Sequence, residues 1–492
     1  MSYYPTLYEV NLRVVLTTLT EGLGRHATMD DVPDETLADW ATKGFDWIWL
    51  MGVWQTGTAA RTISRENAAL RKELQKTLPD IVDGDIIGSG FAVQDYHISR
   101  ELGGNKGLAR LRARMKTHGL KLMLDFVPNH LAPDHKWVNE HPEYFVLGTE
   151  DDLVLQPQNF RRIQTPNGSR IFALGRDPYF PGWIDTLQLN FGNLALQHAM
   201  LGELQRISRS CDGVRCDMAM LVLPAVFKRT WGIESQAFWP SAIRMARELD
   251  PNFLFMAEVY WELEWELQQQ GFDYCYDKRL YDRLRSWEAG PVQRHLAAGL
   301  DFQNRLVRFL ENHDEPRAAK VFPLARHLAA AVITYMTPGL HFFHQGQLEG
   351  HLKHISPHVV RSPVEQVDHA IEGFYLKLLE VLQLPILKEG KWRLLNPKRI
   401  EAEDGSHENL IAFQWDHDHS SILIVAVNYS AERSRASIQI QRELGCMSKD
   451  HFEDLFEDLF DSAVNIKEGI RLNEDELIID LPAWGVQVLM RR

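Results

Sequence analysis

The sequence predicts an α/β protein built on a (β/α)8 TIM barrel. Short apolar runs without alternation recur along the chain, and helical segments of about a dozen residues separate them. Such runs are typical of parallel strands that helices cover on both faces, and eight strand–helix units are enough to close a barrel. The predicted strands are residues 7–14, 45–51, 121–127, 213–217, 253–258, 272–276, 306–311 and 340–344.

Helices are expected between these strands. Residues 30–43, 58–80 and 104–118 combine charged positions with apolar positions at helical spacing. Gly44 and Gly119 follow two of these segments directly, and glycine is the usual residue just past a helix end.

The alternation of predicted strands and helices is interrupted in two regions, which divides the chain into three parts. Residues 131–190 are rich in Pro, Asn, Asp and aromatic residues, and they form an insertion after the third strand. The barrel then comprises residues 1–130 and 191–394. Residues 395–492 are expected to form a C-terminal antiparallel β-sandwich, because short β-type runs separated by turn residues lie at 410–415, 421–428, 436–441 and 477–481.

Composition narrows the class of protein. The 492 residues are 45% hydrophobic and 24% charged, as in soluble globular proteins, and the formal net charge is −14. A strong negative charge argues against nucleic-acid and anionic-membrane partners. We see no signal peptide and no run long enough to cross a membrane. The oligomeric state stays open.

The cysteines give no zinc or disulfide signature. The four cysteines have neither a disulfide framework nor zinc spacing, which favours a reducing, cytoplasmic location. They are Cys211, Cys216, Cys275 and Cys446.

Charged residues stand at the ends of several predicted strands. Arg215 and Asp217 are two positions apart, so both side chains point to the same face of one strand. Each such residue alone has an ordinary structural explanation. In a barrel, however, the carboxyl ends of all strands meet at one rim, where functional sites lie. The residues that would meet there are Asp125, His130, Arg215, Asp217, Glu258, His313 and Asp314.

Carboxylates with different environments are the groups that cleave a glycosidic bond. One must be ionised to attack the sugar, and the other must be protonated to release the leaving oxygen. Arg215 favours the charged form of Asp217. Met256 and Ala257 give Glu258 apolar neighbours, which favours a raised pKa for that carboxyl.

Four motifs then resemble those of a known family. They are D-x-V-x-N-H at 125–130, G-x-R-x-D at 213–217, an apolar run that ends in Glu at 253–258, and N-H-D at 312–314. In this order and spacing they resemble the α-amylase family of retaining glycoside hydrolases and transglycosylases. The resemblance covers the barrel, the insertion and the C-terminal domain.

The resemblance implies a role for each motif residue. Asp217 would be the nucleophile, Glu258 the acid and base, and Asp314 would hold hydroxyls of the bound sugar. It requires no cofactor, although it leaves a structural calcium open, with Asn129 as one ligand and oxygens near residues 150–152 as others. The substrate-binding residues would be Phe91, His130, Arg215, His313 and Asp125.

The expected activity is α-retaining hydrolysis of α-glucosidic bonds. Substrates would be maltooligosaccharides, glycogen or starch fragments, or a small α-glucoside. A transglycosylase, a phosphorylase or an isomerase of the same fold is the alternative, since these share the covalent intermediate and differ in what attacks it. A non-catalytic relative is disfavoured, because all three motif carboxylates are present.

The sequence also departs from the family pattern. Met220 and Leu221 replace a Lys-His pair, which would make the acceptor side unusual. Gly88 stands where exo-acting relatives usually have Asp, which disfavours exo action unless Asp85 or residues 134–137 close the site. The basic, histidine-rich residues 349–361 are expected to be a solvated loop; the alternative is that they contact the aglycone.

Overall fold

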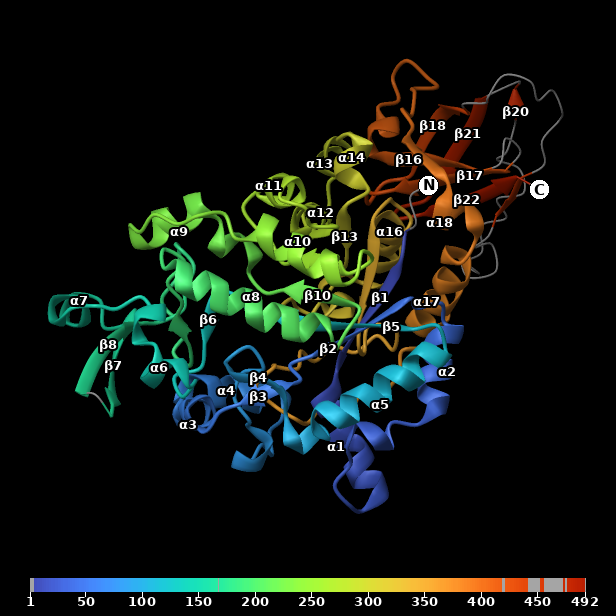
Figure 1. The fold of residues 1–492 in the computed structure, drawn as a ribbon. Helices are drawn as coiled ribbons and strands as arrows, with labels where there is room; N and C mark the ends of the chain where they lie inside the picture. The colour runs from blue at the N-terminus through green and yellow to red at the C-terminus, as the bar shows by residue number, and fades with distance from the viewer. Residues whose placement is uncertain are drawn as a thin grey trace.

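The computed structural model describes residues 4–166, 168–417, 421–440, 452–454, 472–473 and 476–491. A barrel surrounded by helices fills most of the molecule, and a β-sandwich lies beside it at the upper right (Figure 1).

Eight parallel strands close the barrel, which confirms the predicted fold class. Their order around the barrel is β1-β14-β13-β12-β11-β10-β5-β2. Each predicted strand contributes one of them. They are β1 (Thr6–Asn11), β2 (Trp47–Met51), β5 (Lys121–Phe126), β10 (Gly213–Cys216), β11 (Leu254–Ala257), β12 (Tyr274–Tyr276), β13 (Leu306–Arg308) and β14 (Leu340–His344).

Helices connect these strands and cover the outside of the barrel (Figure 1). The principal helices are α1 (Leu12–Leu23), α2 (Asp34–Thr42), α5 (Gly104–Thr117), α8 (Leu194–Ser208), α9 (Pro224–Trp231), α10 (Trp239–Leu249), α11 (Glu264–Gln269), α12 (Lys278–Leu284), α13 (Ala289–Leu296), α16 (Leu324–Tyr335), α17 (His369–Leu382) and α18 (Pro385–Glu389). Shorter helices are α14 (Leu300–Gln303), α15 (Ala318–Val321) and the 3₁₀ helices η1 (Met29–Asp31), η2 (Asp83–Asp85), η3 (Arg100–Leu102), η5 (Ala219–Val222) and η6 (Ser406–Asn409).

The first predicted strand is too long at its C-terminal end. We expected a strand over residues 7–14, but β1 ends at Asn11 and α1 begins at Leu12. The Asn11 side chain accepts a hydrogen bond from the Val14 N–H at 3.4 Å, which caps the helix. The apolar residues that follow are buried on one helix face, so they resemble a continued strand in sequence.

Two predicted helices are each broken by a capping residue. Residues 58–80 form α3 (Thr58–Glu66) and α4 (Ala68–Thr77), because the Asn67 side chain accepts from the N–H groups of Ala69 and Leu70 and starts a new helix. In residues 30–43 the helix α2 begins only after Pro33.

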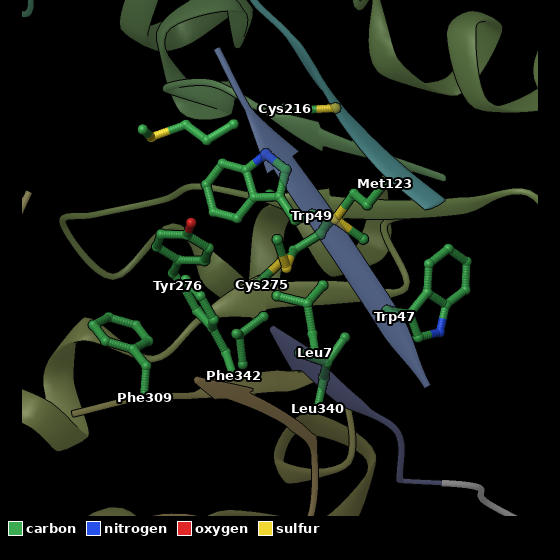
Figure 2. Close-up of a cluster of buried hydrophobic side chains, with 14 of the residues drawn as sticks. Leu7, Trp47, Trp49, Met123, Cys216, Cys275, Tyr276, Phe309, Leu340 and Phe342 are labelled. Atoms are coloured by element: carbon green, nitrogen blue, oxygen red, sulfur yellow. The ribbon is translucent and has the colours of Figure 1, made fainter. Parts of the chain in front are cut away.

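Large apolar side chains fill the interior of the barrel. Leu7, Met123 and Phe342 come from three different strands and have no exposed surface. Figure 2 shows them with Trp49 and Tyr276 in one cluster. The lower barrel is therefore a packed core, and chemistry is confined to the rim above it.

The insertion after β5 contains short elements that sequence patterns did not indicate. The pair β6 (His130–Leu131) and β9 (Leu187–Gln188) closes its base. Its outer part consists of α6 (Trp137–Glu140), η4 (Pro142–Tyr144), α7 (Glu150–Leu155), β7 (Phe160–Thr165) and β8 (Gly168–Ala173). A second excursion, after β2, carries α3 and α4 between β3 (Trp54–Thr56) and β4 (Val93–Ile98).

The C-terminal part is a sandwich of two antiparallel sheets, as expected. One sheet has the order β15-β16-β17-β22-β19 and the other β18-β21-β20, and apolar side chains of both form one core. The first sheet begins before residue 395. The strands are β15 (Lys391–Leu394), β16 (Leu410–His417), β17 (Ser421–Asn428), β18 (Ser434–Gln439), β19 (Phe452–Asp454), β20 (Leu472–Asn473), β21 (Glu476–Leu481) and β22 (Val486–Arg491).

Buried hydrogen bonds attach the sandwich to the barrel. The Trp415 indole donates to the Met336 carbonyl at 2.9 Å, and the Tyr429 hydroxyl donates to the Leu284 carbonyl at 2.6 Å. Both side chains have no exposed surface.

Three of the four cysteines lie in the part of the chain that is described. Cys211, Cys216 and Cys275 are free and buried, whereas Cys446 and the last residue of the predicted strand 436–441 lie outside the described residues. Within the described ranges, no helix is long and apolar enough to cross a bilayer.

A buried ion pair fixes the sixth and seventh strands. The Asp277 carboxylate pairs with Arg308 and lies 2.9 Å from His295. Burial alone would raise the pKa of Asp277, but His295 and Arg308 outweigh burial and lower this pKa to about 2. Asp277 is 2% exposed, so its charge depends on these partners.

We predict that Asp277→Asn lowers the free energy of unfolding by about 3 kcal/mol, because it leaves the Arg308 guanidinium buried without a countercharge. The amide can still cap α12, so the helix start is preserved. Urea unfolding measures the change. Asp39→Asn is the control, since its pair with Lys43 is half-exposed and its loss should cost no more than about 0.5 kcal/mol. Equal stability of the two variants would contradict the prediction.

Candidate active site

Two carboxylates meet where the adjacent strands β10 and β11 end. Cys216 pairs with Ala257 in the parallel register, and the next residues are Asp217 and Glu258. The Glu258 N–H donates to the Cys216 carbonyl at 3.0 Å, which holds the two strand ends together. The Asp217 side chain therefore emerges beside that of Glu258, as the predicted barrel requires.

The Arg215 guanidinium lies between these carboxylates. One amino group forms an ion pair with Asp217, and the other lies 2.7 Å from Oε2 of Glu258. Arg215 has no exposed surface, and its guanidinium lies 5.1 Å from the ring centre of Phe91 and 5.2 Å from that of Trp49. Both carboxylates are thus oriented by one buried cation between aromatic rings.

Glu258 is placed to carry a proton near neutral pH. Burial raises its pKa most strongly, the negative charges of Asp217 and Asp314 raise it further, and Arg215 opposes them; the result is a pKa of about 7. The Tyr260 hydroxyl donates to Oε1 of Glu258 at 2.8 Å. The expectation of a raised pKa for Glu258 agrees with these surroundings.

The backbone of Met218, which is in a strained conformation, also binds the Glu258 carboxylate. Met218 directly follows Asp217 and has a φ of +42°, in the left-handed region that residues with a side chain rarely adopt. Its N–H donates to Oε2 of Glu258 at 2.7 Å. Non-glycine residues keep such a conformation only where the surrounding structure fixes it, which is common at functional sites.

A second group of paired charged side chains, centred on His313, follows β13. His313 lies between two carboxylates: its Nδ1 is 2.6 Å from Oε1 of Glu9, and its Nε2 is 3.1 Å from Oδ2 of Asp314. Burial lowers the pKa of His313, but both carboxylates outweigh burial and hold it well above its usual value. The Asp314 side chain is 47% exposed, so it is the carboxylate that faces the open site.

Phe91 and His130 border the site on the side of His313. The Phe91 ring stacks on the His313 ring, with centres 5.0 Å apart and planes 22° apart. The His130 ring lies 5.1 Å from that of Trp183 in the insertion, and burial lowers its pKa. These rings form a partly apolar boundary, which suits the C–H face of a sugar.

Asp125, which we grouped with the substrate-binding residues, is bonded behind the open site. It has no exposed surface, and its oxygens accept from the Trp49 indole at 3.1 Å and the Gly52 N–H at 2.8 Å. Burial raises its pKa to about 6. In this geometry Asp125 positions the strand ends, and its contact with substrate stays a prediction.

The residues named for calcium do not fit a calcium site. The side-chain and backbone oxygens of Asn129 each accept from the Gln188 amide at 3.0 Å. Glu150 and Asp152 lie on α7 at the outer end of the insertion, where they bond Arg162 and Thr149 (Figure 1). Calcium needs six or more convergent oxygens, and these residues do not converge.

Met220 does not line the acceptor side, contrary to expectation. Met220 and Leu221 lie in η5 and pack into the core, where Met220 has no exposed surface. Met218 takes that place and borders a pocket of about 450 Å³ beside Glu258. The pocket is lined by Asp177, Phe180, Met218, Tyr260, Trp261, Glu262, Glu264, Lys278, Arg279 and Asp282.

Several site residues were not found from the sequence. Glu9 was included in a predicted strand but not as a charged group, although a glutamate inside an apolar strand was a usable signal. Tyr260 has no such signal, because only the three-dimensional position of its hydroxyl relates it to Glu258. Glu311 and Arg317 pair behind the site, with nitrogen and oxygen 2.6 Å apart.

Together these features define a parallel (β/α)8 barrel with carboxylates and one buried arginine at adjacent strand ends. Residues 42–264 match the family model of the α-amylase catalytic domain. This stretch contains three of the four motifs, so the match supports their resemblance to the α-amylase family.

Curated relatives are similar over parts of the chain. The chain is 23% identical over 279 residues to the α-amylase MalA of Haloarcula japonica, covering 55% of this chain and 38% of that protein. It is 20% identical to α-amylase 3 of Dictyoglomus thermophilum, covering 68% and 73%. It is 32% identical over 129 residues to an α-1,4-glucan:maltose-1-phosphate maltosyltransferase of Pseudomonas aeruginosa, covering 26% and 18%.

Solved structures share the fold over the full length. A maltogenic α-amylase, AmyB of Thermotoga neapolitana, superposes with a TM-score of 0.68 at 18% identity and covers 99% of this chain and 98% of its own. An α-amylase of Lactobacillus plantarum has a TM-score of 0.66 at 19% identity, with the same coverage.

We predict that Glu258 titrates near pH 7 and that Tyr260→Phe raises its pKa by about 1. The hydroxyl donates to the carboxylate, so its removal destabilises the ionised form. Carboxyl NMR of protein labelled at glutamate side chains measures both values. Tyr144→Phe, in the insertion, is the control and should leave the titration unchanged. A Glu258 pKa near 4.5 in the wild type, or a decrease in the variant, would contradict the prediction.

Proposed function

We propose that this protein is an α-retaining glycoside hydrolase that cleaves α-glucosidic bonds by double displacement. Its substrates are maltooligosaccharides, glycogen or starch fragments, or a small α-glucoside. One observation carries the proposal: Asp217 and Glu258 share the Arg215 guanidinium, yet burial and neighbouring charge raise the pKa of Glu258 to about 7. One carboxylate is then available to attack and the other to give a proton.

In the first step, an oxygen of Asp217 attacks the anomeric carbon and forms a glycosyl ester. The bond between that carbon and the leaving oxygen breaks, and Glu258 transfers its proton to this oxygen. Asp314, the exposed carboxylate beside His313, accepts hydrogen bonds from sugar hydroxyls. His130 and Phe91 border the ring of the same sugar.

In the second step, ionised Glu258 takes a proton from water as the water oxygen attacks the anomeric carbon. The ester bond breaks and returns Asp217 as a carboxylate. Two inversions at one carbon retain the α configuration.

Transfer to an acceptor is the second candidate. It is supported by the similarity to maltosyltransferases over about a quarter of the chain. A sugar hydroxyl would then replace water in the second step. Phosphorolysis is less well supported, because the pocket beside Glu258 has four acidic side chains, Asp177, Glu262, Glu264 and Asp282, against two basic ones. The cytoplasmic location stays a prediction.

We predict that Asp217→Asn lowers turnover of maltooligosaccharides by about 1,000-fold or more, since an amide cannot form the ester. Products are followed by mass spectrometry in a time course. Asp250→Asn is the control, because Asp250 lies in the loop before β11, away from the rim, and its loss should leave turnover within about twofold. Near-normal turnover by a folded Asp217→Asn variant would exclude Asp217 as the nucleophile.

A further inference from the structure

The position of the acid, Glu258, identifies which side of the site binds the aglycone and which side binds the glycone. The acid protonates the leaving oxygen, so the aglycone lies on the side of Glu258. The pocket formed by Met218, Tyr260 and Trp261 is therefore on the aglycone side. The glycone lies on the opposite side, toward His313 and Phe91.

On the glycone side, two distant segments of the chain are joined by backbone hydrogen bonds. The Ile87 N–H donates to the His358 carbonyl at 3.0 Å, and the Val360 N–H donates to the Asp85 carbonyl at 3.1 Å. Ile86 and Val359 pair between them as an antiparallel bridge. The segment after β14 is thus attached to the excursion after β2.

Apolar packing and an ion pair strengthen this junction. Arg361 lies 2.9 Å from Asp85 and 3.1 Å from Asp80. Val359 is 1% exposed and belongs to a separate apolar cluster, whose other buried members are Leu74, Leu78, Ile81 and Ile86. The expectation of a solvated loop over residues 349–361 is therefore wrong for its second half, because α4 and the segment before Gly88 cover it.

The junction is anchored next to the catalytic residues. The Arg317 guanidinium donates to the carbonyls of Gln345 at 2.7 Å and Lys353 at 3.0 Å, which fixes the start of the segment after β14. Nε2 of His354 lies 2.5 Å from the His313 carbonyl. The segment consequently passes directly beside the residue that holds Asp314.

The other end of the junction reaches the insertion after β5. An Asp134 oxygen accepts from the Ala59 N–H at 3.0 Å, and Oγ of Ser64 lies 3.1 Å from Nδ1 of His358. Through α3, the junction extends from β14 past β2 to the insertion. We call residues 58–64, 85–88 and 354–361 the glycone wall.

Gly88 shows how closely α3 approaches this wall. Its φ is +88°, and a Cβ at this position would lie 3.0 Å from the backbone nitrogen of Arg61. An aspartate cannot stand here without displacing helix backbone. The close approach of α3 thus explains why glycine, and not aspartate, stands at position 88. Asp85 and Asp134, which we named from the sequence as alternatives, hold the segments of the wall together.

We propose that the glycone wall closes this side of the site, so that the enzyme acts only at the non-reducing end of its substrate. A cleft that cuts within a chain must be open on both sides of the bond. Here hydrogen bonds join the segments after β14 and β2 to each other and to the insertion. The pocket of about 450 Å³ lies on the other side, where residues after β10, β11 and β12 line it together with part of the insertion. The inference rests on the proposed function and adds exo action to it.

Two maltoheptaosides test the proposal. One is p-nitrophenyl α-maltoheptaoside with a free non-reducing end, and the other carries a 4,6-O-ethylidene group there. Mass spectrometry follows the products. We expect stepwise shortening of the free substrate from its non-reducing end, and a kcat/KM at least about 100-fold lower for the blocked one, because the wall leaves no room for the added group. Equal kcat/KM values, with cleavage inside the chain, would overturn the proposal.

A wall variant links this result to the structure. Arg361→Ala removes both ion pairs of the junction and is expected to raise the ratio of blocked to free kcat/KM by about tenfold. Arg433→Ala is the matched control, because Arg433 pairs with Asp480 at 2.7 Å in the sandwich and should leave the ratio unchanged. An unchanged ratio in Arg361→Ala would count against the wall.

A third substrate distinguishes failure of the proposed hydrolase function from failure of the proposed exo action. α-Glucosyl fluoride needs only the glycone position beside Asp217 and little help from an acid. Its hydrolysis, together with equal cleavage of both heptaosides, would leave the proposed function standing and overturn the wall. No turnover of the fluoride or of either heptaoside would overturn the proposed function and the wall with it.

Discussion

The active rim depends on one buried cation. Arg215 has no exposed surface, and its two amino groups contact Asp217 and Glu258. Two carboxylates this close cannot both be ionised without a compensating charge. Arg215 supplies that charge from within β10, while burial keeps Glu258 close to its neutral form. The two carboxyl groups thus have different surroundings, which the proposed cleavage of a glycosidic bond requires.

The barrel provides the geometry for this arrangement, and the loops decide what can enter. Met218, two positions after β10, and Tyr260, three positions after β11, donate hydrogen bonds to Glu258 and border the pocket that we propose for the aglycone. Segments from β14, β2 and β5 join into the glycone wall on the other side. In our proposal, exo action follows from loop-to-loop contacts such as Arg361 with Asp85 and not from a change in the motif carboxylates.

The strands and the motif residues were predictable because short stretches of sequence determine them. Short, largely apolar runs identified all eight strands, and the barrel brings the motif residues at their ends together. The failures have two causes. Asn11 ends a strand by a local contact, because its side chain caps the helix at the Val14 N–H. Asp125 bonds Trp49 and Gly52 behind the site, and residues 354–361 pack on a segment more than 250 positions away. These last two depend on partners distant in sequence, which composition and periodicity do not reveal.

The anomeric configuration of the first product distinguishes a double from a single displacement. Proton NMR of the anomeric signals during the first minutes of maltooligosaccharide hydrolysis distinguishes the α from the β form before mutarotation mixes them. Our account predicts that the α anomer appears first, because Asp217 forms a covalent ester and the carbon is inverted twice. Initial release of the β anomer would mean a single displacement by water, and it would contradict the assignment of Asp217 as nucleophile.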